Sequence, residues 1–198
     1  MGAVQIGKKY FHNYKVSQSR ANGILNQANV KNFSLIDTAR TYGLSEKFIR
    51  NYLYKFKNNF KISSKLKPLG KIKSKEKTIK HINQSIFESL LNLRISSFDY
   101  FLIHDVKDLK NKYLINHLKK FLDCGVIKNL GVSIYNNNEL KIVKKIKIIN
   151  SLQIPFNIID HRLIELLQNK KKYVIFIRSI LLRGNIKNKK ICFNNNKK

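Results

Sequence analysis

The stretch "FSLIDTARTYGLSEKFI", residues 33–49, joins an apolar strand pattern to a helical pattern through a short polar turn. Apolar residues dominate Phe33–Asp37, and from Ser45 onward they recur at helical spacing. Asp37 closes the strand, and Tyr42 follows five residues later beside a glycine. A strand followed by a helix is the repeating unit of a parallel α/β sheet, so this stretch predicts the fold class.

The same unit repeats along the chain, because short runs rich in Ile, Val, Leu and Phe alternate with longer stretches of helical periodicity. The predicted strands are Ala3–Ile6, Phe33–Asp37, Phe60–Ser64, Phe98–His104, Lys128–Ser133, Ser151–Ile154 and Tyr173–Ser179. The predicted helices are Gln18–Asn29, Ser45–Phe56, Glu76–Leu93, Leu109–Cys124, Asn137–Ile146 and Leu163–Asn169. No linker rich in Pro, Gly or Ser divides them, so residues 1–198 are predicted to form one domain with a disordered polar tail, residues 184–198.

Repeated strand and helix units fit two architectures, an open doubly wound sheet and a closed (β/α)8 barrel of the TIM type. An open sheet that binds a dinucleotide carries GxGxxG after its first strand, whereas residues 5–15 read "QIGKKYFHNYK". We therefore predict an α/β fold of the TIM (β/α)8-barrel type. A complete barrel takes about 250 residues, and this chain has 198. The expected barrel is incomplete and ends after strand 7, and its unpaired edges invite self-association.

Polar side chains stand where a barrel carries its chemistry, at or just beyond the carboxyl ends of the predicted strands. They are Asp37, Tyr42, Lys65 and His104. Each has a simpler interpretation when taken alone. Asp37 could cap a helix, Tyr42 could pack within its loop, Lys65 could be solvated, and His104 could be a structural histidine. Four titratable groups at one rim would instead form a reactive centre.

Lysine dominates the charge of the chain, since 33 Lys and 7 Arg against 11 acidic residues give a net charge of +29. Such a charge could attract nucleic acid or an anionic membrane surface. Lysine, asparagine and isoleucine all have A/T-rich codons, so mutational bias produces the same composition. The lysines are spread along the chain and do not cluster with arginine and aromatic residues, so nucleic acid is not expected as a partner.

The two cysteines, Cys124 and Cys192, have a spacing that suits neither a disulfide framework nor a structural zinc site. No apolar run approaches the roughly 18 residues of a membrane span, and the N-terminus lacks the order of a secretory signal. We therefore expect a cytoplasmic protein without a metal ion and without membrane contact.

Six segments, in order along the chain, carry a family resemblance. They read "IDTARTYGLSEKFI", "KISSKL", "LRISSFDYFLIHD", "GVIKNLGVSIY", "LQIPFNIIDHRLI" and "IFIRSILLRGNI". Together they resemble the successive motif blocks of the aldo-keto reductase superfamily, and the opening "GAVQIGKKY" is similar to the first strand of a bacterial branch of it. The resemblance spans residues 2–186 and would describe a chain shortened at its C-terminal end.

The resemblance implies a barrel that uses NADPH, with NADH as the alternative, to reduce a small aldehyde or ketone. It assigns proton donation to Tyr42, charged partners to Lys65 and Asp37, and orientation of the substrate carbonyl to His104. A free tyrosine has a pKa of about 10 and becomes a useful acid only when a nearby ammonium lowers that pKa. Lys65 can supply the ammonium, and Asp37 would keep it protonated.

The resemblance also implies a cofactor-binding set made of Ser133, Gln153, Arg178 and Ser179. Many members of the family have Ser-Asn where this chain has Ser133 followed by isoleucine, and many stack a tyrosine on the nicotinamide where it has Arg178. The bacterial branch shares both departures. The remaining histidines match no metal spacing, so no metal site is expected.

Two alternatives remain open at this point. One is a shortened relative that keeps the barrel core without turnover, which would show no heat on titration with NADPH. The other is a basic protein that binds nucleic acid through lysine, whose binding would weaken steeply with salt.

Overall fold

A computed structural model describes residues 1–8, 16–56, 60–168 and 172–182. The helices are α1 (Val4–Gly7), α2 (Gln18–Val30), α3 (Ser45–Phe56), α4 (Lys75–Leu93), α5 (Leu114–Asp123), α6 (Asn137–Val143) and α7 (Ile164–Gln168), with a 3-10 helix, η1 (Val106–Lys110). The strands are β1 (Leu35–Asp37), β2 (Lys61–Leu66), β3 (Tyr100–Ile103), β4 (Leu130–Ser133), β5 (Ile149–Pro155) and β6 (Val174–Arg178). Cys192 and the tail expected at residues 184–198 lie outside the described residues.

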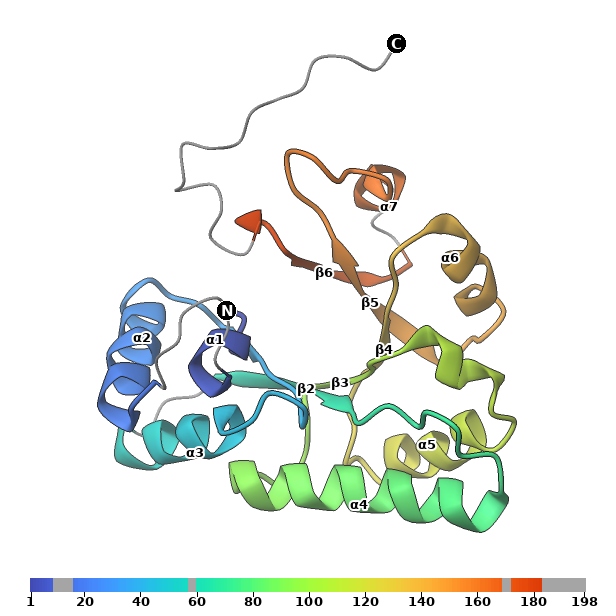
Figure 1. Cartoon of the computed structure of the whole chain (residues 1–198), viewed down its shortest axis with the longest axis horizontal. Coiled ribbons are helices and arrows are strands. Elements are labelled where there is room, and N and C mark those ends of the chain that lie inside the picture. Colours follow the sequence, from blue (N-terminus) through green and yellow to red (C-terminus); the bar gives the residue numbers. More distant parts are fainter. Residues whose placement is uncertain (9–15, 57–59, 169–171, 183–198) are drawn as a thin grey trace.

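The strands form one parallel sheet in the order β1-β2-β3-β4-β5-β6, so each strand pairs with the next one along the chain. Figure 1 shows the helices as an outer arc around a curled sheet. This arrangement is an incomplete α/β barrel of the TIM type. The fold class predicted from the repeating strand and helix pattern is therefore confirmed.

The prediction of a first strand at Ala3–Ile6 was wrong, because these residues enter helix α1 instead. The chain does start alongside β1, where the Asp37 N–H donates to Met1 O and the Ala3 N–H donates to Asp37 O, both at 2.8 Å. β1 has only three residues, so the ladder ends there. The Ser45 hydroxyl donates a hydrogen bond to the Ala3 carbonyl at 3.1 Å. The described residues consequently hold six strands where seven were expected.

The helix predicted at Leu109–Cys124 is also different, since the segment divides into η1 and α5. The Asp105 carboxylate accepts the Lys107 N–H at 2.9 Å and starts η1, and the Asn111 side chain accepts the Tyr113 N–H at 3.0 Å between the two helices. These local side-chain bonds offer the backbone an alternative to a continuous helix.

Strand β2 shows how the sheet separates apolar from polar contacts. Ser64 faces the helices, because its hydroxyl donates to the Glu46 carboxylate of α3 at 3.1 Å. Ser63 and Lys65, one residue to either side, face the inside of the curl, as the alternation of a strand requires. The helix-facing layer is the apolar core, whose buried members include Leu25, Ile36, Ile49, Tyr52, Ile62, Leu66, Ile82, Ile86, Phe101 and Leu118. The inner face of β2 carries the ammonium of Lys65, whereas its helix-facing side is apolar except for the Ser64–Glu46 pair.

No helix in the described ranges is both long enough and apolar enough to cross a bilayer.

Candidate active site

Lys65 is the most deeply buried charged group of the inner face, with 0% of its side chain exposed. Its ammonium donates to both carboxylate oxygens of Asp37 at 2.7 Å and to the Thr38 carbonyl at 2.8 Å. Burial lowers the pKa of Lys65 from its usual 10.5, and the charge and hydrogen bonds of Asp37 oppose that shift. A buried ammonium is tolerated here because oxygen acceptors surround it.

Asp37, at the end of β1, is the hub that joins three strands. Its Oδ1 also accepts the Ser63 hydroxyl at 3.0 Å, and its Oδ2 accepts the Gln153 amide of β5 at 3.0 Å. The contact of Asp37 with Gln153 spans the inside of the curl, since 116 positions separate the two residues along the chain. Ser63 was absent from the predicted site, although its place two residues before Lys65 on a strand is a signal that the two share a face.

Tyr42 lies in the loop between β1 and α3, beside Lys65 and His104. The Lys65 Nζ is 5.0 Å from the centroid of the Tyr42 ring. The ring centroids of Tyr42 and His104 are 6.1 Å apart, with an interplanar angle of 81°. The structure therefore brings all four residues of the predicted catalytic set to the same end of the sheet.

The loop that carries Tyr42 is held against helix α1. The Tyr42 N–H donates to Ala39 O at 2.9 Å, and the Leu44 N–H donates to Gly7 O at 3.2 Å. A Cβ atom placed on Gly7 would lie only 1.8 Å from the Tyr42 carbonyl oxygen. Only glycine fits this approach, so Gly7 fixes the position of the tyrosine loop.

His104 follows β3 and is half-buried. Burial, together with the positive charges of Lys65 and Arg178, lowers the pKa of His104 to about 4. Its imidazole is consequently neutral at pH 7, with one nitrogen able to donate and the other to accept. The His104 Nδ1 atom is buried and has no hydrogen-bond partner among the described residues.

The residues expected to bind a cofactor lie at or near the carboxyl ends of β4, β5 and β6. Ser133 is buried and pairs in register with Gln153, whose carbonyl accepts the Ile134 N–H at 2.9 Å. Arg178 is the last residue of β6, and its guanidinium carbon lies 4.2 Å from the centroid of the Tyr135 ring. Ser179 has a φ of +62°, so the chain turns directly after Arg178 in a conformation that is uncommon for serine.

Two of the remaining histidines lie on the helices and make structural contacts. His81 bonds to the Lys67 carbonyl at 2.8 Å, and His117 bonds to the Asn83 side chain at 2.6 Å. Within the described residues, no group of three or more His, Cys, Asp or Glu side chains could hold a metal ion.

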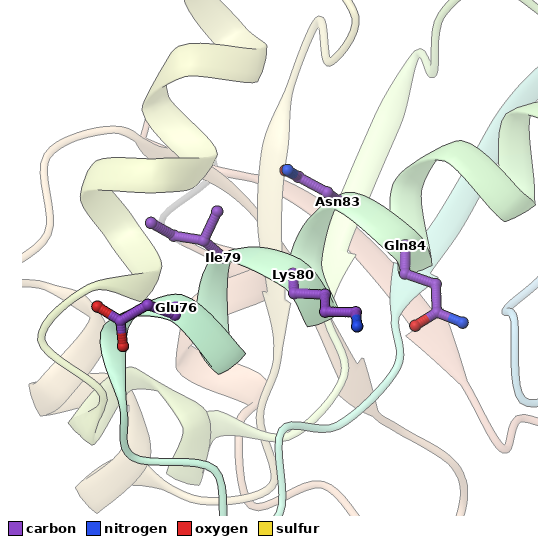
Figure 2. Close-up of a pocket in the computed structure, with 5 residues that line it drawn as sticks. All are labelled: Glu76, Ile79, Lys80, Asn83 and Gln84. Carbon is purple, nitrogen blue, oxygen red and sulfur yellow. The ribbon is translucent and has the colours of Figure 1, made fainter.

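The hollows on the outside of the molecule are separate from the strand ends. Figure 2 shows one of them on helix α4, lined by Glu76, Ile79, Lys80, Asn83 and Gln84. A second lies over α3 and α4 and is lined by Arg50, Phe87, Leu90, Leu91, Arg94 and Ile95. None of these residues belongs to the predicted site, so neither hollow explains the cluster at the strand ends.

Comparison with models of protein families identifies the family of the chain. The model of the aldo/keto reductase family matches residues 1–196. None of the curated proteins matches the chain.

Solved structures share the fold at low sequence identity. An aldo-keto reductase of Bacillus halodurans in its holo form superposes with a TM-score of 0.77 and 20% identity, and the match covers 100% of this chain and 66% of that one. A Pseudomonas aeruginosa structure titled as an aldo-keto reductase gives 0.74 and 20%, covering 89% of this chain and 71% of that one. A Klebsiella pneumoniae aldo/keto reductase in complex with NADP and acetate gives 0.71 and 16%, covering 91% and 64%.

Proposed function

Because the chain belongs to the aldo/keto reductase family, we propose that it reduces an aldehyde or ketone to an alcohol with a nicotinamide cofactor. The observation that carries the proposal is the cluster of Asp37, Tyr42, Lys65 and His104 at one end of the sheet. These groups supply a proton donor, a buried cation and a neutral hydrogen-bond donor around one point.

Tyr42 is the proposed proton donor. As the carbonyl is reduced, negative charge grows on its oxygen and the Tyr42 hydroxyl proton moves to that oxygen, which leaves a phenolate. The Lys65 ammonium is fully buried and lies 5.0 Å from the ring centroid, so it can stabilise the phenolate. Asp37 holds that ammonium in place through two 2.7 Å contacts.

His104 is the proposed orienting group. The pKa of His104 is about 4, so its imidazole is neutral at pH 7. It can then donate a hydrogen bond to the carbonyl oxygen without acting as a second general acid. The neutral ring also avoids placing a third positive charge beside Lys65 and Arg178, which both lower its pKa. His104 would therefore position the substrate while Tyr42 transfers the proton.

The cofactor, when bound, supplies a hydride to the carbonyl carbon. Ser133, Gln153, Arg178 and Ser179 are proposed to line its nicotinamide end. Their positions fit such a group, because Ser133 and Gln153 are buried polar residues and the Arg178 guanidinium is planar. NADPH is the proposed cofactor and NADH the alternative; the choice of NADPH is supported by the Klebsiella aldo/keto reductase, which is in complex with NADP.

The test follows NADPH oxidation with small aldehydes by the absorbance of the reduced nicotinamide. Tyr42→Phe should lower kcat/KM about 100-fold or more, since a positioned proton donor contributes about that much. Tyr54→Phe is the matched control, because Tyr54 is 78% exposed on α3 and should keep its rate. Equal rates for the wild type and Tyr42→Phe would remove Tyr42 from the reaction.

A further inference from the structure

Arg178 differs from the other charged groups of the inner face because its hydrogen-bond donors are unused. The Nε and Nη2 atoms are both buried, and neither finds a partner among the described residues. The guanidinium carbon lies 4.2 Å from the centroid of the Tyr135 ring, a cation–π contact that stabilises the position of the group. Arg178 as a whole is only partly buried, but two buried donors without an acceptor are unfavourable unless a ligand completes them.

The two free atoms form one edge of the guanidinium. Nε and Nη2 point in parallel along that edge, and this pair of donors matches the two oxygens of a carboxylate in a bidentate contact. Lys65, by contrast, already has the Asp37 carboxylate and the Thr38 carbonyl as acceptors.

Within the described part of the chain, the charges at the strand ends also leave one positive charge without an ion pair. Asp37 is matched by Lys65 at 2.7 Å, and His104 is neutral at pH 7, so the charge of Arg178 remains. The nearest acid to His104 along the chain, Asp105, uses its carboxylate to cap η1 through the Lys107 N–H. Arg178 acts on both Lys65 and His104 electrostatically, which places its charge at the same site.

We propose that Arg178 is a specificity-determining residue that binds a carboxylate on the carbonyl substrate through its Nε and Nη2 atoms. The substrate class is an aldehyde or ketone that carries a carboxylate. This inference rests on the proposed carbonyl reduction. A phosphate oxygen of the cofactor offers the same chemistry to Arg178, so the experiment separates the two sources.

The experiment compares kcat/KM for acids and their neutral methyl esters. The pairs are glyoxylate, succinic semialdehyde and 4-carboxybenzaldehyde with the corresponding esters, so that the distance from carbonyl to carboxylate varies. The wild type should prefer at least one acid over its ester by about tenfold or more. In Arg178→Gln that ratio should fall to about one, and in Arg178→Lys, which keeps the charge and loses the fork, it should be intermediate.

A matched control removes a positive charge elsewhere. Lys128 is exposed and pairs with Asp99 at 3.0 Å, just before the first residue of β4 and so at the amino-terminal side of the sheet. Lys128→Gln should keep the ratio of acid to ester, so a loss of the ratio in this variant would assign the preference to overall charge and overturn the inference. A ratio near one in the wild type for all three pairs would also overturn it.

Direct titrations keep the outcomes separate. If Arg178→Gln weakens NADPH binding about tenfold while the acid preference is unchanged, the anion belongs to the cofactor and the substrate assignment is wrong. If no aldehyde is turned over, the proposed reduction fails, and the inference then depends on benzoate binding measured by calorimetry. Benzoate should bind the wild type and not Arg178→Gln, and equal binding would overturn the carboxylate site. Thermal unfolding of each variant confirms that the protein under test is folded.

Discussion

The two cations of the inner face, Lys65 and Arg178, are partnered in opposite ways. At the β1 and β2 end, Lys65 donates to Asp37 and Thr38 and is completed by the protein itself. At the β6 end, the Nε and Nη2 atoms of Arg178 have no acceptor among the described residues. Lys65 is therefore part of the permanent structure of the site, whereas the two free donors of Arg178 are available to a ligand.

The outer edges of the same two strands differ as well. The edge of β1 is covered by residues 1–3, which bond to Asp37 through two backbone contacts. β6 has one sheet neighbour, β5, in the described part of the chain, and Val174 and Ile177 on it are 44% and 38% exposed. An uncovered strand edge is a site for pairing with another chain.

Disrupting the ion pair of Lys65 and Asp37 should have the largest effect on stability and turnover. Lys65→Met leaves the partly buried Asp37 carboxylate without its cation, so the free energy of unfolding should fall by about 3–5 kcal/mol and turnover should be lost. Urea unfolding measures the first and NADPH oxidation the second. Adding Asp37→Asn to Lys65→Met should recover part of the stability, because it removes the unpaired charge. A loss below about 1 kcal/mol in the single variant would contradict the assigned role of the pair.

Displacing the tyrosine loop should have the next largest effect. A methyl group at Gly7 would meet the Tyr42 carbonyl at 1.8 Å, so Gly7→Ala should shift the loop and lower stability by about 1–3 kcal/mol. Turnover should fall because Tyr42 moves relative to Lys65. Gly23→Ala in α2 is the control, since nothing lies within 4 Å of its added atom, and it should stabilise the protein by up to about 1 kcal/mol. Equal stabilities for the two variants would show that the close approach of Gly7 is unimportant.

Protonation of His104 should have a smaller effect. Its pKa is about 4 in the folded protein and about 6.5 in the unfolded chain, so between these values only the unfolded chain binds the proton. The free energy of unfolding should therefore fall as the pH drops from 6.5 to 4, by about 1–2 kcal/mol more in the wild type than in His104→Gln. His161→Gln, at an exposed position, should follow the wild type. Parallel curves for the wild type and His104→Gln would contradict the lowered pKa.

A substitution on the exposed edge strand β6 should have the smallest effect on the stability of the monomer. Ile177→Lys places a charge on the exposed edge strand and should reduce self-association, which sedimentation velocity would detect as a shift to smaller species at high concentration. The stability of the monomer should change by less than about 0.5 kcal/mol. If the wild type associates and Ile177→Lys sediments in the same way, the contact between chains lies on another surface.

Much of the fold was predictable from the sequence because the repeating unit is local. The strands at Leu35–Asp37 and Lys61–Leu66 carry their own apolar patterns and polar ends. The first element was missed because its apolar residues suit either a short strand or a helix turn. The outcome depends on a distant contact, the Ser45 hydroxyl on the Ala3 carbonyl.

The candidate site was predictable as a set of residues and much less so as a network. Asp37 and Lys65 could be placed together because both close predicted strands of one parallel sheet. The contact of Asp37 with Gln153 joins β1 to β5, and no local pattern signals it. Tyr135 also escaped prediction, since its stacking on Arg178 depends on how the turn after β4 meets the end of β6.

The most direct test of carbonyl reduction at this cluster follows the hydride itself. The full-length protein is incubated with an aldehyde and NADPH deuterated at the transferring position of C4, and the alcohol is analysed by mass spectrometry. The account predicts an alcohol with one deuterium on its carbinol carbon for the wild type and a loss of that product in Tyr42→Phe. An alcohol without deuterium, or equal deuterated product from both proteins, would contradict it.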